Sequence, residues 1–559
     1  DGTTGRLFRE FSIVVSGSLI ISSFAAFTVT QMLATKLLIK REQQSWFYRK
    51  TEPFFEGMNR VYSQSLAAFL KRRWIALPFT IVTILLIGVL WNTIPAEMAP
   101  LEDRSQISIN TMGAEGVTYE YIRDYTEDIN HLVDSIIPDA EAVTARVSSG
   151  SGNVRITLKD MKDRDYTQME VAEKLSKAVQ KKTMARSFVQ QSSSFGGRRG
   201  GMPVQYVLQA TNIEKLQEVL PKFMTKVYEN PVFQMADVNL KFSKPEARIN
   251  INRDKASIMG VSTKNIAQTL QYGLSGQRMG YFYMNGKQYE ILGEINRQQR
   301  NKPADLKGIY IRSDNGNMVQ LDNLIELTGG IAPPKLYRYN RFVSATISAG
   351  LADGKTIGQG LDEMDKIAKE TLDETFRTAL TGDSKEYRES SSSLMFAFIL
   401  AIVLIYLILA AQFESFKDPL IIMLTVPLAI AGALVFMYFG GITMNIFSQI
   451  GIIMLIGLVA KNGILIVEFA NQKQEAGEDK MRAIKDASLQ RLRPILMTSA
   501  STILGLIPLA YATGEGCNQR IAMGTAVVGG MLISTLLTMY IVPAIYSYVS
   551  TNRSKLKTE

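Results

Sequence analysis

The sequence predicts a multi-span α-helical membrane domain joined to a large soluble block of mixed α and β structure. Seven apolar segments are each long enough, at roughly 20 residues, to cross a bilayer. They cover residues 11–35, 74–94, 391–411, 419–439, 445–469, 494–513 and 524–549. Residues 95–390 lie between the second and third segments, have ordinary globular composition and are numerous enough for two or more domains.

The distribution of positive charge predicts how these spans are oriented. Residues 36–73 carry nine Lys and Arg against three acids, and the predicted loop 470–493 and the tail TNRSKLKTE are also basic. The positive-inside rule assigns all three to the cytoplasm. The soluble block is then external, which means periplasmic if the protein lies in the inner membrane of a Gram-negative bacterium. Membrane topology thus explains the net charge of +10, and no nucleic-acid partner is predicted.

Strands and helices alternate along the soluble block in the split βαβ pattern. In the first copy, strands are expected near 105–112, 141–147, 153–160 and 184–191, with helices near 117–136 and 167–182. A second copy begins with a strand at 203–210, a helix at 212–229 and a strand at 233–240. It is completed about a hundred residues later by a strand at 341–350, a helix at 355–372 and a strand at 376–382. The residues between these two parts are predicted to form an inserted domain.

These patterns divide the chain into five regions. They are the first two spans (1–94), porter subdomain 1 (95–201), porter subdomain 2 (202–240 with 336–385), an inserted subdomain (241–335) and a five-span bundle (386–559). Apolar residues at helical spacing within 51–72 predict a helix on the cytoplasmic membrane surface, with a buried soluble helix as the alternative. The composition of residues 192–201, SSSFGGRRGG, predicts a flexible connector.

Several kinds of chemistry are excluded by what the sequence lacks. Cys517 and His131 are the only residues of their types, so neither a disulfide framework nor a Cys- or His-based metal site is predicted. No phosphate-binding P-loop and no pairing of a nucleophile with a His base occurs. We therefore expect a protein that binds no cofactor or metal and is not an enzyme. If it performs work, the energy must come through the membrane spans.

One lysine interrupts the fifth apolar segment, in IGLVAKNGILIVEF at 456–469. The ammonium of Lys461 costs ~3 kcal/mol or more at the middle of a bilayer, and such charges are usually functional. Glu468 lies two helical turns away, about 10 Å along the axis, which is too far for an ion pair. The partner carboxylate is therefore expected on sequence absent from this chain or on another subunit.

Three further polar residues are candidates beside it. Arg491 and Thr498, in RLRPILMTSAS, are seven residues apart and share a helix face, while Asn462 follows the lysine directly. Each has a structural alternative. Arg491 and Arg493 could extend to the cytoplasmic interface, the Thr498 hydroxyl could bond to its own helix, and Asn462 could hold helices together.

The motifs GLVAKNGILIVEFA, RLRPILMTS, GRLFREFS and VGGMLISTLLTMYIVPAIY closely resemble the resistance-nodulation-division (RND) efflux pumps, in the hydrophobe/amphiphile branch typified by AcrB. A subunit of that family has twelve spans and two porter halves, so this chain resembles its last seven spans and second porter half. By this resemblance, Lys461 lies beside two aspartates of the fourth span and takes part in proton coupling, with Arg491 and Thr498 nearby. Asn462, next to the lysine, is predicted to belong to the same relay.

The resemblance also implies a secondary transporter, a proton/drug antiporter acting on amphiphilic small molecules. Its partners would be the missing half of the subunit, a homotrimer or related heterotrimer, a periplasmic adaptor and a TolC-like outer-membrane channel docked by residues 241–335. Phe188 and Phe195 are placed near the substrate cleft. The loop that carries several phenylalanines in drug pumps corresponds to 145–157, which has none.

Two other functions remain open from the sequence. The chain could be a membrane-anchored periplasmic scaffold or sensor whose intramembrane lysine locks helices together. It could also be an RND exporter of lipids or other non-drug substrates.

Overall fold

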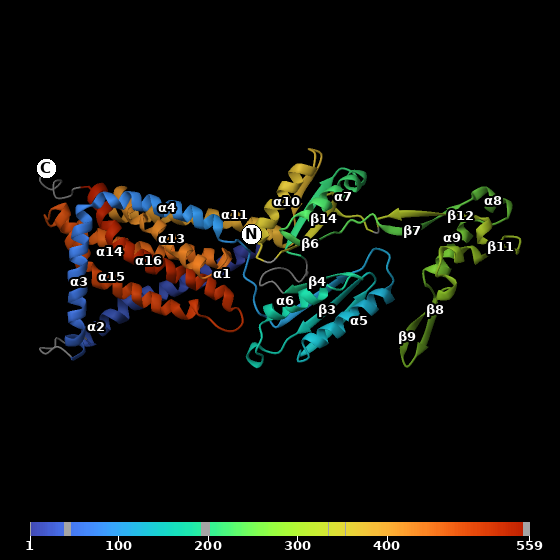
Figure 1. Ribbon diagram of the computed structural model, residues 1–559, viewed down its shortest axis with the longest axis horizontal. Helices are drawn as coiled ribbons and strands as arrows, with labels where there is room; N and C mark the ends of the chain where they lie inside the picture. Colours follow the sequence, from blue (N-terminus) through green and yellow to red (C-terminus); the bar gives the residue numbers. More distant parts are fainter. Residues whose placement is uncertain (1, 38–45, 192–201, 334, 353, 552–559) are drawn as a thin grey trace. The chain divides into compact units, whose positions relative to one another are not determined.

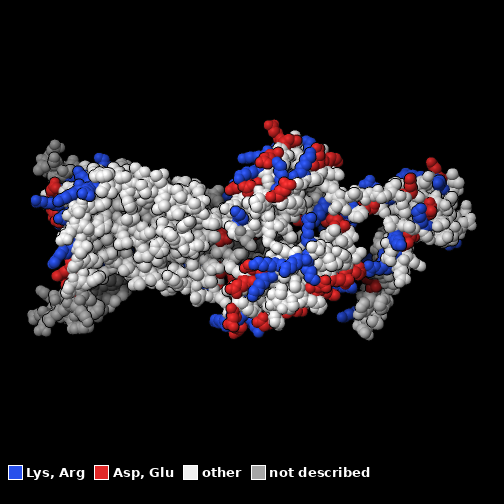
Figure 2. All heavy atoms as spheres, viewed as in Figure 1, with Lys and Arg blue, Asp and Glu red and all other residues white. Residues whose placement is uncertain are grey.

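The structure, a computed structural model, describes residues 2–37, 46–191, 202–333, 335–352 and 354–551. Within these ranges seven helices are long and apolar enough to cross a membrane, which confirms the seven predicted spans. The helices are α1 (Gly2–Ala25), continuing through a π-helical turn (Ala26–Thr30) into α2 (Gln31–Leu37), α4 (Ala76–Thr93), α11 (Gly382–Phe413), α12 (Lys417–Met423) followed by α13 (Thr425–Phe439), α14 (Ile446–Glu475), α15 (Lys480–Ala510) and α16 (Cys517–Val549). On the face that Figure 2 shows, the middle of this helical bundle is almost free of charged residues, which gather at its end.

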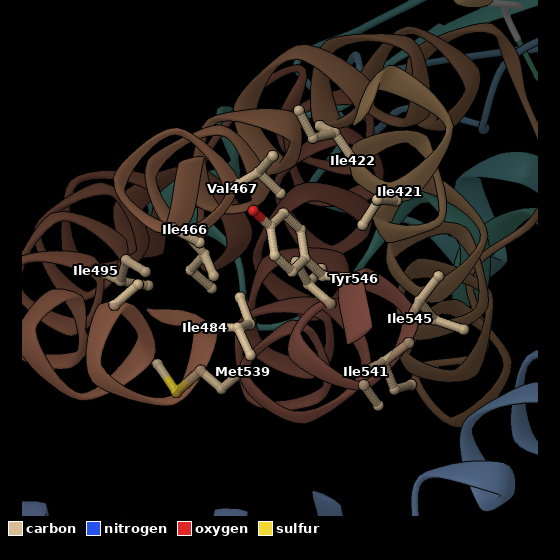
Figure 3. Close-up of a cluster of buried hydrophobic side chains, with 14 of the residues drawn as sticks. Ile421, Ile422, Ile466, Val467, Ile484, Ile495, Met539, Ile541, Ile545 and Tyr546 are labelled. Carbon is tan, nitrogen blue, oxygen red and sulfur yellow. The ribbon is translucent and has the colours of Figure 1, made fainter. Parts of the chain in front are cut away.

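Helix α16 packs against α13, α14 and α15. Small residues along α16 make this possible, since helices in a membrane associate closely where side chains are small. A Cβ added to Gly529 would lie 2.4 Å from the Phe436 side chain, and one added to Gly530 would lie 2.1 Å from Leu455. Nearer the C-terminal end of α16, the ring of Tyr546 is buried among aliphatic side chains (Figure 3).

Helix α3 (Trp46–Lys71) covers the stretch predicted as a surface helix. Its buried residues Tyr62, Leu66 and Leu70 belong to the same apolar cluster as residues of α15 and α16. The Tyr62 hydroxyl donates to the backbone carbonyl of Met539 at 2.6 Å. One face of α3 is therefore fixed to the membrane helices.

The predicted loop at 470–493 is wrong. α14 extends to Glu475 and α15 already begins at Lys480, so only 476–479 connects them. The Asp479 side chain accepts from the backbone N–H of Met481 at 3.1 Å and caps α15. The basic residues that suggested a loop lie on helix ends that continue past the apolar segments.

The first sheet contains β1 (Gln106–Met112), β2 (Ala142–Ser148), β3 (Ser151–Thr157) and β4 (Arg186–Gln191) in the order β2-β3-β1-β4, with every neighbouring pair antiparallel. Helices α5 (Tyr119–Ile136) and α6 (Gln168–Val179) contribute to one core with it. Within that core Ile129 and Leu175, from the two helices, are fully buried together with Ile109 of β1. The alternation of buried and exposed residues along β1 and β3 explains why both strands were visible in the sequence.

The second sheet joins strands from both sides of the insertion. β5 (Val204–Ala210) and β6 (Phe233–Val238) precede it, whereas β13 (Arg338–Tyr339), β14 (Phe342–Leu351) and β15 (Arg377–Leu380) follow it. β14 pairs with both β5 and β6, and β15 pairs with β5. Helices α7 (Ile213–Glu229) and α10 (Ile357–Thr371) pack against each other and against β5.

Helix α11 begins within this second sheet region. The Ser384 hydroxyl accepts from the backbone N–H of Gln205 at 2.8 Å and donates to the Pro203 carbonyl at 3.1 Å, so the start of α11 is bonded to β5. The helix then runs unbroken for 32 residues to Phe413. The boundary expected at 385/386, between porter subdomain 2 and the bundle, thus falls inside one continuous helix.

Residues Leu240–Tyr337 form a separate compact unit together with Gly113–Tyr121, a segment that the sequence assigned to porter subdomain 1. Its elements are β7 (Lys244–Ile251), α8 (Arg253–Ile258), α9 (Thr263–Leu274), β8 (Gln277–Met284), β9 (Lys287–Gly293), β10 (Tyr310–Arg312), β11 (Met318–Gln320) and β12 (Ile325–Ala332) (Figure 1). β7 and β12 pair antiparallel over their whole length. Glu120 forms an ion pair with Arg297, which ties the short segment to the rest of the unit.

Candidate functional site

Lys461 lies at the middle of α14. The helix begins after Asn445, whose side chain accepts from the backbone N–H groups of Phe447 and Ser448 at 3.0 Å each. Lys461 follows 15 residues after Ile446, so it is about 22 Å from that end by helix rise. Its side chain is exposed, whereas its neighbours Ala460 and Asn462 are buried. The lysine therefore occupies a face of α14 that the described part of the chain leaves uncovered.

No carboxylate of the described residues forms an ion pair with this ammonium. Glu468 on the same helix instead accepts from the Gln472 side chain at 3.0 Å. Asp418, at the start of α12, accepts from Asn471 at 3.1 Å, ten residues beyond the lysine along α14. These two acids of the membrane helices thus have other hydrogen-bond partners.

Asn462 joins three helices. Its Nδ2 donates to Ser499 Oγ of α15 at 3.3 Å and to Thr535 Oγ1 of α16 at 3.4 Å, and these two hydroxyls lie 3.2 Å apart. All three residues are buried. The Oδ1 of Asn462 has no hydrogen-bond partner among the described residues. Sequence reasoning missed Ser499 and Thr535, although polar residues inside apolar spans were the available signal.

Arg491 contacts Phe469 rather than Lys461. Its guanidinium lies 4.4 Å from the centre of the Phe469 ring, and its Nε is buried without a hydrogen-bond partner in the part of the chain that is described. Phe469 is eight residues past Lys461 on α14, about 12 Å along the axis. Arg493, by contrast, lies 3.3 Å from the Glu52 carboxylate and over the ring of Phe55, both on α3.

Thr498 and Phe188 have partners other than Lys461. The Thr498 hydroxyl donates to the Ile495 carbonyl of its own helix at 3.2 Å. Phe188 is half-buried in β4, opposite Asn110 of β1. Phe195 falls outside the described residues. The 145–157 segment, which lacks phenylalanine, forms most of the β2–β3 hairpin.

Comparison with known proteins identifies the family. The model of the AcrB/AcrD/AcrF family matches residues 1–550, nearly the whole chain. The chain belongs to the AcrB/AcrD/AcrF family. It is also 30% identical, over 565 residues, to an uncharacterized transporter of Haemophilus influenzae (strain ATCC 51907 / DSM 11121 / KW20 / Rd). That alignment covers 99% of this chain and 55% of the relative, so the chain spans about half the length of this relative.

Proposed function

We propose that the chain forms the second half of a transporter that uses the proton motive force to export hydrophobic and amphiphilic compounds. The observation that carries this proposal is Lys461: an ammonium lies at the middle of a span, on an uncovered face, and forms no ion pair with a carboxylate of the described residues. Such a charge is too costly in a bilayer to remain unpaired. Its counter-ion is proposed to be an acid pair on the missing half of the subunit.

The proposed cycle follows from the attraction between these charges, which is strong in a low-dielectric interior. While the acids are ionised they hold the Lys461 ammonium. When they take up protons the attraction is lost, Lys461 turns to another acceptor and α14 changes its packing. Asn462, Arg491 and Thr498 would support this relay, Asn462 through its bonds to α15 and α16.

The soluble part is proposed to handle the substrate. The two sheet regions would be porter subdomains built on split βαβ units, with Phe188 near the cleft between them. Residues 241–335 would dock a TolC-like outer-membrane channel through a periplasmic adaptor, in a trimer in the inner membrane of a Gram-negative bacterium. Family membership supports these assignments.

The test is Lys461→Met in the intact transporter. Removing the ammonium lowers the cost of membrane insertion by ~3 kcal/mol, so expression and assembly should be at least normal. Export of amphiphilic dyes should nevertheless be abolished, because the acid pair has lost its switchable counter-ion. Dye export is measured in proteoliposomes with and without a proton gradient, at matched protein levels.

Lys473→Met is the matched control. Lys473 lies on the same helix but near its end, in an ion pair with Glu478 at 2.8 Å, and its loss should leave export largely intact. Thr498→Ala should reduce export less than Lys461→Met, since water can replace a hydroxyl. Normal proton-dependent export by Lys461→Met would refute the relay. Poor assembly without a specific loss of export would favour a scaffold.

A further inference from the structure

The linker between α4 and β1, residues 94–105, contacts two membrane helices and porter subdomain 1 in succession. Its first contacts are with the start of α14. The Met444 N–H donates to the Pro95 carbonyl at 2.8 Å, the Glu97 N–H donates to the Met444 carbonyl at 3.0 Å, and the Ile446 N–H donates to the Met98 carbonyl at 3.2 Å. The linker is therefore bonded to the end of the helix that carries Lys461.

Its second contact is a buried carboxylate. Glu102 is 1% exposed, and its two oxygens accept from the backbone N–H groups of Gln519 at 2.8 Å and Asn518 at 3.4 Å. These N–H groups belong to the first turn of α16, where no carbonyl of the helix can accept them. The Asn518 side chain also donates to the Leu101 carbonyl at 2.7 Å. A carboxylate at this positive end of a helix makes a charge-assisted bond that is costly to break.

The third contact begins at the next residue. The Asp103 carboxylate accepts from the N–H of Gln168, at the start of α6, at 2.9 Å and from Arg164, whose side chain is fully buried. The Gln168 side chain accepts from the N–H groups of Arg104 and Gln106 and donates to the Glu102 carbonyl at 3.4 Å. Glu102 thus contacts a membrane helix through its side chain and porter subdomain 1 through its backbone.

We propose that Glu102 is a positioning residue that transmits displacement of α16 and α14 to porter subdomain 1. The inference rests on the proposed function. If α16 moved without Glu102, a buried carboxylate and two N–H groups of the first turn of α16 would lose their partners together, so the linker moves with the helix. Because Asp103 and Gln168 fix the adjacent backbone to α6, the sheet region follows.

The experiment measures whether a proton gradient moves one porter subdomain relative to the other. Spin labels are placed at Lys174→Cys on α6 and Lys222→Cys on α7, two exposed positions, with Cys517→Ser throughout. Distances between the labels are measured in proteoliposomes with and without a proton gradient, and dye export is measured in parallel. Glu102→Gln keeps the size of the side chain but turns an amide toward backbone donors. Glu515→Gln makes the same charge change at an exposed residue next to the same helix.

The expected result is that the label distance shifts with the gradient in the parent and in Glu515→Gln, and that Glu102→Gln loses both the shift and export. Asp103→Asn, which perturbs only the porter end of the linker, should lose them as well, and it decides the case if Glu102→Gln does not assemble. If a variant at either position assembles normally and keeps the gradient-dependent shift in label distance, the role of Glu102 is refuted and the proposed function is unaffected. A parent with neither gradient-driven export nor a shift overturns the proposed function and the inference with it.

Discussion

Replacing Asn462 by leucine should leave the bundle as stable as before, or make it more stable. The substitution removes two long hydrogen bonds, to Ser499 and Thr535, each worth ~0.6 kcal/mol between membrane helices. It also removes the unpartnered Oδ1, a buried group that costs roughly 1–3 kcal/mol. Ser499 and Thr535 still bond to each other. The net change should lie between zero and about 2 kcal/mol of stabilisation.

Asn471→Leu is the matched comparison, because Asn471 is equally buried on the same helix but both of its polar atoms are used. Its Nδ2 donates to Asp418 at 3.1 Å and its Oδ1 accepts from the Tyr546 hydroxyl at 2.5 Å. Its loss takes a donor from a buried carboxylate and an acceptor from a buried hydroxyl, so it should destabilise by roughly 2–4 kcal/mol.

Thermal unfolding in detergent compares the two variants, and dye export is measured alongside. If Asn462 supports the relay, Asn462→Leu should melt at or above the temperature of the parent and still export poorly. If Asn462→Leu melts as low as Asn471→Leu, the residue holds helices together and the reasoning above is refuted.

Three further predictions concern other parts of the chain. Arg297, 2.7 Å from the second oxygen of Glu120, lowers the pKa of that carboxyl to about 2. The ion pair therefore stabilises the folded state at any pH above the ordinary carboxyl pKa, and this contribution is lost as the pH falls through about 2. At pH 5, Glu120→Gln should therefore speed hydrogen exchange in Gly113–Tyr121, and unchanged exchange would contradict this. A Cβ on Gly524 would lie 2.5 Å from the backbone nitrogen of Ala510, so Gly524→Ala should destabilise by about 1–3 kcal/mol. Gly505 has nothing within 4 Å of an added Cβ, so Gly505→Ala should stabilise the protein by up to ~1 kcal/mol. The melting temperature of each alanine variant checks its prediction.

Much of the fold could be predicted because it depends on local patterns. Length and hydropathy identify a span without any knowledge of its neighbours, and alternation of burial identifies β1 and β3. Residues 470–493 were wrongly predicted as a loop for the same reason, because Lys and Arg are equally compatible with a loop and with a helix that continues into water. Local composition does not distinguish the two.

The contacts of the site could not be predicted, because they join residues far apart in the sequence. Glu102 and Gln519 are 417 positions apart, and Glu52 and Arg493 are 441 apart. The hydrogen bond from Thr498 to the Ile495 carbonyl is an exception, because it is local and matches the predicted alternative that this hydroxyl bonds to its own helix. The need of Lys461 for a counter-ion was also visible in the sequence, because it follows from the cost of a charge in an apolar span and requires no partner to be named.

The unbroken helix α11 connects the second sheet directly to the membrane bundle. Its 32 residues span roughly 48 Å, so a tilt of about 5° at one end would displace the other by ~4 Å. Because its first turn is bonded to β5, that lever arm acts directly on the second sheet. The first sheet is connected to the membrane helices through the 94–105 linker, which is bonded to the ends of α14 and α16 and does not continue either helix. A single small rearrangement among the membrane helices would therefore displace the two sheets by unequal amounts, and neither sheet would need to deform.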